Sequence, residues 1–171
     1  MKNIIFINGT MGVGKTTTSR ELQSLLPKSV LLDGDWCWDM NPFIVTEETK
    51  KMVQDNIRYM LNNFLKCSEY KNIIFCWVMH EEYIIESILS GLNLKDATLY
   101  KISLICSEQS LVERLSRDVG NGIRSKDVIA RSVSRLKNYT LMNTTKVDVS
   151  KINAVQASQQ IISYIGELYE T

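Results

Sequence analysis

A glycine-rich octapeptide near the amino terminus constrains the fold of this chain more than any other feature. Residues 9–16 read GTMGVGKT and satisfy every fixed position of the pattern G-x-x-x-x-G-K-[ST]. The apolar residues 4–7 before it predict a buried strand, and residues 15–26 after it predict a helix with leucines on one face. Because strand, loop and helix follow in this order, the octapeptide predicts a phosphate-binding loop (P-loop) rather than a plain glycine turn.

Each residue type in the P-loop suits the binding of a nucleoside triphosphate. The glycines allow successive backbone N–H groups to surround an anion, and the helix that follows adds the positive end of its dipole. Lys15 is placed to bridge the β- and γ-phosphates, and the Thr16 hydroxyl is placed to bind Mg²⁺. The residues expected to bind ATP are Gly9, Thr10, Met11, Gly12, Val13, Gly14, Lys15, Thr16 and Thr17.

Strand-like and helix-like segments alternate along the whole chain. Four further strands are predicted at residues 29–32, 72–79, 98–106 and 145–149. Helical patterns cover residues 46–66, 81–89, 107–117, 126–142 and 154–168. This alternation predicts an α/β fold with one domain over residues 1–171, in which a five-stranded parallel sheet carries helices on both faces. Ligands of such a sheet bind beyond the carboxyl ends of its strands.

The composition is that of a soluble globular chain with little net charge. Hydrophobic residues make up 44% of the 171 residues, and the net charge is +1. This balance provides no general attraction to nucleic acid or to acidic membranes, and no apolar run is long enough to span a bilayer. Residues 1–3 lead directly into the first strand, so we expect no signal peptide and a cytoplasmic protein. The expected oligomeric state is a monomer or a homodimer.

The four cysteines are expected to be reduced, small apolar residues. They form no C-x-x-C pair, and they lie in or beside apolar stretches. A zinc site would lack ligands, because His80 is the only histidine.

Two aspartates follow the second predicted strand directly. Asp33 and Asp35 flank Gly34, which allows the chain to leave the strand sharply. Because the carboxyl ends of parallel strands share one edge, we expect both carboxylates to lie near the P-loop. There Asp33 suits the Mg²⁺ side, and Asp35 suits an acceptor hydroxyl whose proton it would take or orient. The alternative is a β-turn in which an aspartate occupies a favoured turn position.

A glycine-bearing stretch with an arginine on either side predicts a short lid over residues 118–125 or so. Arg117 ends the fourth predicted helix, Arg124 follows the loop, and Gly120 and Gly122 lie between them. A mobile arginine can neutralise the charge that phosphoryl transfer spreads over the moving group, so we expect Arg124 to be catalytic. For Arg117, an interaction with the helix dipole is an equally good alternative.

These three motifs together resemble the small-molecule kinases of the nucleoside-monophosphate-kinase-like group, such as shikimate kinase, gluconate kinase and chloramphenicol phosphotransferase. The resemblance covers nearly the whole chain in element order, although only the P-loop is a highly specific motif. It implies the sheet order 2-3-1-4-5, with ATP and Mg²⁺ as cofactors. It also implies that Asp33 lies near Mg²⁺ and that Asp35 contacts the acceptor hydroxyl. Arg117 would lie against the adenine, Arg124 would reach the phosphates, and the loop through Ser150 would edge the adenine.

Two departures from shikimate kinase argue against shikimate as the acceptor. Residues 76–80, CWVMH, replace the triple glycine that follows its third strand, and residues 139–143 lack its acceptor-binding arginine. Aromatic side chains on the acceptor side would suit sugars, nucleosides or drug-like rings. We expect Trp36 and His80 to bind the acceptor, although Trp36 fits core packing and His80 fits a helix cap equally well. Trp77, inside an apolar strand, fits core packing better.

The sequence therefore predicts Mg-assisted transfer of the γ-phosphate of ATP to a hydroxyl of a small-molecule acceptor, with Lys15, Asp35 and Arg124 as catalytic residues. Neither nucleic acid nor a membrane is the expected partner. One alternative is a kinase of nucleosides, nucleotides or nucleic-acid 5′ ends, for which the basic residues within 126–142 would matter. Others are a nucleotide-binding protein without transfer activity and a GTP-dependent switch, since residues 145–148, TKVD, resemble a guanine-reading motif.

Overall fold

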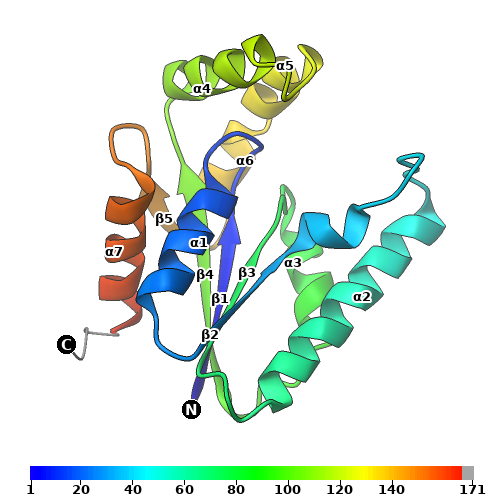
Figure 1. Cartoon of the computed structure of the whole chain (residues 1–171), viewed down its shortest axis with the longest axis vertical. Helices are drawn as coiled ribbons and strands as arrows, with labels where there is room; N and C mark the ends of the chain where they lie inside the picture. The colour runs from blue at the N-terminus through cyan, green and yellow to red at the C-terminus, as the bar shows by residue number, and fades with distance from the viewer. Residues whose placement is uncertain (167–171) are drawn as a thin grey trace.

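Five parallel strands form the centre of the molecule (Figure 1). In this computed structural model, which describes residues 1–166, they are β1 (Lys2–Asn8), β2 (Ser29–Asp33), β3 (Asn72–Cys76), β4 (Ala97–Ile105) and β5 (Thr145–Asp148). They lie in the order β2-β3-β1-β4-β5, so that the first strand of the chain is central. The predicted α/β fold class and sheet order are confirmed.

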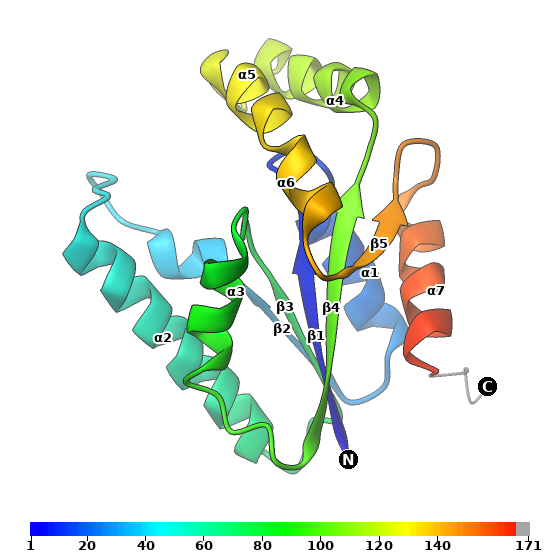
Figure 2. The same cartoon turned by 180° about the vertical axis from the view of Figure 1, so that it is seen from behind.

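The alternating side chains of β1 explain why helices cover both faces of the sheet (Figures 1 and 2). One face carries α1 (Lys15–Leu25) and α7 (Ala154–Ile165), and the other carries α2 (Glu47–Lys66) and α3 (Glu82–Leu89). Ile5 and Ile7 pack in the core with α1 and α7, whereas Ile4 and Phe6 pack in the core with α2 and α3. Because successive side chains of a strand point to opposite faces, a single apolar run supplies both cores.

The helices that connect β4 with β5 stand over the carboxyl end of the sheet (Figure 1). They are α4 (Glu108–Gly120), α5 (Asp127–Ser134) and α6 (Leu136–Leu141). Leu111 and Leu115 of α4 pack with Val128 of α5, and the side chain of Met11 from the P-loop packs against this small apolar cluster. The connection thus brings the predicted arginine lid to the edge where ligands of parallel sheets bind.

Two predicted element boundaries near this edge differ from those in the structure. Residues 34–38 form a short 3₁₀ helix, η1 (Gly34–Trp38), rather than the predicted loop, because the Asp33 carboxylate accepts a hydrogen bond from the backbone N–H of Asp35. Helix α4 continues to Gly120, past its predicted end at Arg117, since the half-buried Val119 still packs against the α4–α5 cluster. The first residues of the predicted lid are therefore helical, and only residues 121–126 lie between α4 and α5.

The helix predicted over residues 126–142 is instead two helices, α5 and α6, which meet at Arg135. Val128 and Ser132 of α5 are buried, with Val128 in the cluster shared with α4, whereas α6 buries Tyr139 and contacts β4. A straight helix could not reach both surfaces, so the chain bends between them. The last helix begins at Ala154 as predicted but ends at Ile165, because Gly166 adopts a left-handed conformation that terminates it. Residues 167–168 of the predicted helix lie outside the described residues.

The four cysteines are free thiols, as predicted. Cys76 is buried in β3, and the other three are partly buried. Burial raises the pKa of the Cys76 thiol to about 12, which keeps it uncharged and unreactive at neutral pH. Of the helices within residues 1–166, none combines the length and the apolar composition needed to cross a bilayer.

Candidate functional site

The P-loop follows β1 in backbone conformations that glycine adopts readily. Gly9 has a φ of 149° and Gly12 a φ of 81°. A Cβ atom on Gly9 would lie 2.8 Å from the carbonyl oxygen of Leu104, and one on Gly12 would lie 2.4 Å from Cδ2 of Leu115. A side chain at either position would force the loop away from β4 or α4. Helix α1 begins within the motif, at Lys15, so that its positive dipole end faces the same space.

Lys15 is half-buried and reaches back to the backbone of its own loop. Its Nζ donates a hydrogen bond to the carbonyl oxygen of Thr10, at 3.1 Å. Removal from water lowers the pKa of Lys15 to about 8; the nearby Arg124 acts in the same direction, and Asp33 and Asp35 oppose it. A bound phosphate would supply the counter-charge that this lysine lacks.

Asn8, the last residue of β1, joins the P-loop to the segment that follows β3. Its side-chain oxygen accepts hydrogen bonds from the backbone N–H groups of Gly9, at 2.8 Å, and Met79, at 2.9 Å. Its Nδ2 donates to the carbonyl oxygen of Met79, at 2.8 Å. Asn8 is 1% exposed, so these bonds are shielded from water. Sequence reasoning missed this residue, and its only signal was a polar side chain at the end of an apolar strand.

Arg114 likewise joins separate segments, because it links α4 to the P-loop and to the residue that follows β5. Its guanidinium donates hydrogen bonds to the carbonyl oxygens of Val13, at 3.0 Å, and Val149. Nearby, the Thr10 hydroxyl donates to the carbonyl oxygen of Ser132 in α5, at 2.9 Å. The P-loop is therefore joined to α4 by Arg114 and to α5 by Thr10. Arg114 was not among the predicted site residues, although its place beside Arg117 at the end of a helix was visible.

The Thr16 hydroxyl and the Asp33 carboxylate, the two predicted Mg²⁺ ligands, lie side by side at the edge of the sheet. The Thr16 hydroxyl donates to Oδ2 of Asp33, at 2.7 Å, while Oδ1 of Asp33 accepts from the backbone of Asp35, at 3.1 Å. Asp33 is 5% exposed, so its carboxylate is held in place. These hard oxygen atoms fit Mg²⁺, which prefers one or two protein oxygens together with phosphates and water. Within residues 1–166, no three His, Cys, Asp or Glu side chains gather as a metal site.

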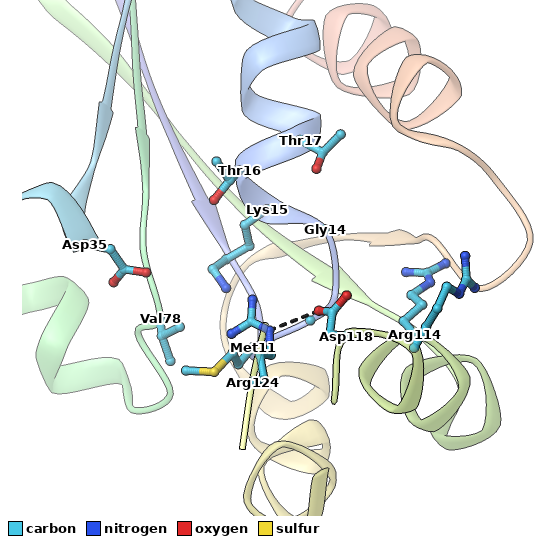
Figure 3. A pocket seen from close by; sticks show the side chains of 12 residues that line it. Met11, Gly14, Lys15, Thr16, Thr17, Asp35, Val78, Arg114, Asp118 and Arg124 are labelled. Carbon is cyan, nitrogen blue, oxygen red and sulfur yellow. Dashed lines mark hydrogen bonds and ion pairs between the residues drawn. The ribbon is translucent and has the colours of Figure 1, made fainter. Parts of the chain in front are cut away.

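Asp35 lines the pocket from η1, and Figure 3 shows Lys15 and Arg124 between Asp35 and Arg114. Partial burial raises its pKa, and the charge of Asp33 adds to this effect. Lys15, a hydrogen bond from the Trp77 side chain and Arg124 oppose the shift. A carboxylate with a raised pKa is a better proton acceptor near neutral pH than an ordinary aspartate.

The lid arginines complete a pocket of about 300 Å³ above the P-loop (Figure 3). Arg117 and Arg124 both line it, and Nε of Arg124 donates to Oδ2 of Asp118, at 3.0 Å. The pocket is lined by Met11, Gly12, Gly14, Lys15, Thr16, Thr17, Asp35, Val78, Arg114, Arg117, Asp118 and Arg124. Residues predicted from three separate motifs thus share a single cavity. Its four basic side chains favour an anionic ligand.

Of the residues predicted to bind the acceptor, Asp35 lines this pocket, whereas Trp36 and His80 do not. Trp36 is 50% exposed, and it does not line the cavity. His80 is partly buried; its Nε2 lies 3.6 Å from a carboxylate oxygen of Glu81, and burial together with Arg135 lowers its pKa. Trp77 packs with the α2–α3 core, so close to Gly34 that a Cβ atom there would lie 2.5 Å from the indole. The expected packing role of Trp77 is thereby confirmed.

Ser150 also lies outside the pocket, and its hydroxyl joins the ends of β5 and β4. It donates to Oδ1 of Asp148, at 2.6 Å, and accepts from the backbone N–H of Ser107, at 2.8 Å. A second hollow of about 260 Å³ lies beside it. Its lining consists of Val13, Gly14, Thr17, Thr18, Arg114, Val149, Ile152, Asn153 and Ala154. This hollow adjoins the P-loop on the side where the sequence resemblance implies the adenine.

Solved structures with this fold are numerous, and several are kinases. The tunicamycin resistance protein of Deinococcus radiodurans superposes with a TM-score of 0.69 and 22% identity over 97% of this chain and 96% of its own. Shikimate kinase from Acinetobacter baumannii in complex with shikimate gives 0.65 and 19% over 99% and 97%. A gluconokinase from Sinorhizobium meliloti 1021 gives 0.62 and 13% over 98% of both chains. At these identities the likeness shows the fold alone. A comparison with curated protein sequences finds no match.

The family of the chain follows from its sequence together with this site. Residues 5–143 match the profile of the family described as the AAA domain. The matched region contains the P-loop, Asp33, Asp35 and the lid arginines, and it covers well over half of the 171 residues. The chain therefore belongs to this AAA domain family of P-loop proteins.

Proposed function

We propose that the protein is an ATP-dependent kinase that transfers the γ-phosphate to a hydroxyl group of a small molecule. The observation that carries the proposal is the position of Asp35, which faces the same cavity as the P-loop lysine and the lid arginine. A protein that only bound nucleotide would need the P-loop and the arginines. It would have no use for an additional carboxylate directed at the phosphate end of the pocket, because that charge repels phosphate.

In the proposed reaction the acceptor hydroxyl lies between Asp35 and the γ-phosphate. Its oxygen forms a bond with the γ-phosphorus, the bond from that phosphorus to the bridging oxygen of ADP breaks, and Asp35 takes the hydroxyl proton. Lys15 and Arg124 neutralise the charge on the oxygens of the moving group. Mg²⁺, held by Thr16 with Asp33 beside it, would supply further charge neutralisation. The geometry of the P-loop keeps these groups in place before substrate arrives.

The surroundings of Asp35 favour a small organic acceptor over nucleic acid. Beside Asp35, the pocket is lined by the apolar side chains of Val78 and Met11. The charged groups that act on Asp35 are Asp33, Lys15 and Arg124, of which the two cations are assigned to phosphate. A nucleic-acid chain would need several further cations along this side.

The residues of the TKVD sequence give no support to a GTP-dependent switch. Nζ of Lys146 donates hydrogen bonds to the carbonyl oxygens of Met142 and Thr144, and Asp148 accepts from Ser150. Both polar side chains are thus occupied within their own loops, on and beside an edge strand. A guanine base would have to compete with these bonds.

The test is a panel of sugars, nucleosides, aminoglycosides and other hydroxyl compounds, assayed for the ADP that forms from Mg-ATP. We expect at least one compound to stimulate ADP formation, with a phosphorylated product of matching mass. Lys15→Met serves as the control for contaminating kinases. A panel that leaves the rate at its acceptor-free level, with Mg-ATP bound normally, would favour a nucleotide-binding protein without transfer activity.

A further inference from the structure

Asp118 lies on the basic side of the pocket, where a negative charge weakens the binding of phosphate. It lines the cavity together with Arg114, Arg117 and Arg124. A carboxylate in such a place repels the anion that its neighbours attract. Because Asp118 cannot assist phosphate binding directly, its role is inferred from the side chain that it contacts.

The contact is a single hydrogen bond to one particular nitrogen of Arg124. Oδ2 of Asp118 accepts from Nε, at 3.0 Å, and both side chains are 33% exposed. Among residues 1–166, no hydrogen bond engages the two terminal amino groups of Arg124. Figure 3 shows the guanidinium between the Asp118 carboxylate and the Lys15 amine. The terminal amino groups are the part of an arginine that binds a phosphate in bidentate fashion.

The backbone explains why the acid holds the arginine, rather than the reverse. Asp118 belongs to α4, which continues to Gly120, whereas Arg124 lies in the segment between α4 and α5. The carbonyl oxygen of Asp118 also accepts from the backbone N–H of Ile123, at 2.9 Å. A residue on a helix thus fixes both the backbone and the side chain of the segment that carries the arginine.

We propose that Asp118 is the positioning residue of Arg124: it binds Nε so that the terminal amino groups face the phosphoryl group during transfer. This inference rests on the proposed phosphoryl transfer. It assigns to Asp118 no contact with substrate. Its effect should therefore appear in the transition state and be small in the binding of ADP.

Calorimetric titration can separate this role from simple charge repulsion. The wild-type protein is titrated with Mg-ADP alone and with Mg-ADP plus aluminium fluoride, which imitates the phosphoryl group in transfer. We expect aluminium fluoride to tighten the binding of Mg-ADP by the wild type, and we call this increase in affinity the gain. Asp118→Ala should reduce the gain by roughly ten- to a hundredfold. Binding of Mg-ADP alone should stay equal or become a few-fold tighter, because a repulsive charge is lost. Asp118→Asn keeps an oxygen that can accept from Nε, and it should preserve most of the gain.

Two further variants make the test specific. Arg124→Ala should lose the same gain, and the double variant should lose no more than Arg124→Ala alone, because the two residues act as a unit. Asp127→Ala removes an acid from an exposed ion pair with Arg131 in the neighbouring helix, 3.5 Å apart, and should leave the gain unchanged. The inference fails if Asp118→Ala tightens both ligands equally, or if the wild type shows no gain. Failure of acceptor-stimulated turnover with the gain intact would instead reject the acceptor part of the proposed function.

Discussion

The site that we propose has a donor half and an acceptor half, which are held in different ways. The donor half, made of the P-loop with Arg114, is joined to α5 and to the segments that follow β3 and β5 by hydrogen bonds from Thr10, Asn8 and Arg114. The acceptor half consists of Asp35, which lines the pocket, and residues 36–46, which follow it in the chain and do not line the pocket. This segment exposes large apolar side chains. These include Trp36 at 50%, Phe43 at 67%, Ile44 at 46% and Val45 at 52%. From this difference we expect the nucleotide to bind a preformed site, and the exposed apolar side chains of residues 36–46 to become covered when an acceptor binds.

The strongest challenge to this comparison is to remove the charge at the centre of the donor half. In Lys15→Ala the phosphates lose their principal cation, and turnover should fall about a thousandfold or more. The free energy of unfolding should not fall, because the variant also removes a partly desolvated charge. Steady-state ADP formation and denaturant unfolding measure the two effects. Retention of more than roughly a tenth of the activity would show that the P-loop is not the donor site.

Removal of Arg114 tests whether the donor half needs its connections. Arg114→Ala leaves the carbonyl oxygens of Val13 and Val149 without their charged donor. We expect a loss of about 2 kcal/mol in the free energy of unfolding and a fall of roughly tenfold in Mg-ADP affinity. Arg117→Ala is the matched control: this arginine lies three residues along α4, lines the same pocket and is exposed, so stability should be unchanged. If both variants lose affinity but neither loses stability, Arg114 acts only as a ligand.

The pH dependence of the donor half follows from Lys15. Its pKa lies at about 8 without nucleotide, below its ordinary value, and a bound phosphate raises it. Affinity for Mg-ADP should therefore be level below pH 8 and fall by up to about tenfold per pH unit above it. The free energy of unfolding of the nucleotide-free protein should rise as the pH increases above 8, because the folded state then no longer holds the unfavourable charge of Lys15. Titration calorimetry of the wild type against Lys15→Met checks this, and an identical profile in both would assign the dependence to another group.

Substitutions in the acceptor half should have smaller effects, and these should appear in the KM for the acceptor rather than in the affinity for nucleotide. Phe43→Ser removes an exposed ring that contacts only Trp38 among the aromatic side chains of residues 1–166, with ring centroids 5.7 Å apart. We expect the KM for the acceptor to rise about three- to tenfold, with unchanged ADP affinity and a stability change within about 0.5 kcal/mol. Tyr59→Ser, which is equally exposed on α2, serves as the control. A change in ADP affinity instead would contradict the division into two halves.

The donor half was accessible from the sequence because its chemistry resides in consecutive backbone groups. Glycines at fixed spacing and one lysine suffice to predict it. Asp35 and Arg124 were predicted because short segments after strands and helices converge at one edge of a parallel sheet. The sheet order came from the resemblance of the motifs to a known group of kinases, and the structure confirms it.

The connections that hold the donor half were not predictable, because they join residues far apart in the chain. Asn8 and Met79 are 71 residues apart, and Arg114 and Val13 are 101 residues apart. Nothing local distinguishes Asn8 from any polar residue at the end of a strand. The expected pocket positions of Trp36, His80 and Ser150 also depended on tertiary packing, and the structure leaves all three outside the main cavity.

The most direct test of the central claim compares the wild type with Asp35→Asn in acceptor-stimulated turnover and in nucleotide binding. Acceptor-stimulated ADP formation is measured with the best acceptor of the panel, and Mg-ADP affinity is measured on the same preparations. If Asp35 accepts the hydroxyl proton, kcat should fall by about a hundred- to ten-thousandfold while Mg-ADP affinity stays within about threefold or rises. Unchanged acceptor-stimulated turnover in Asp35→Asn would contradict the account.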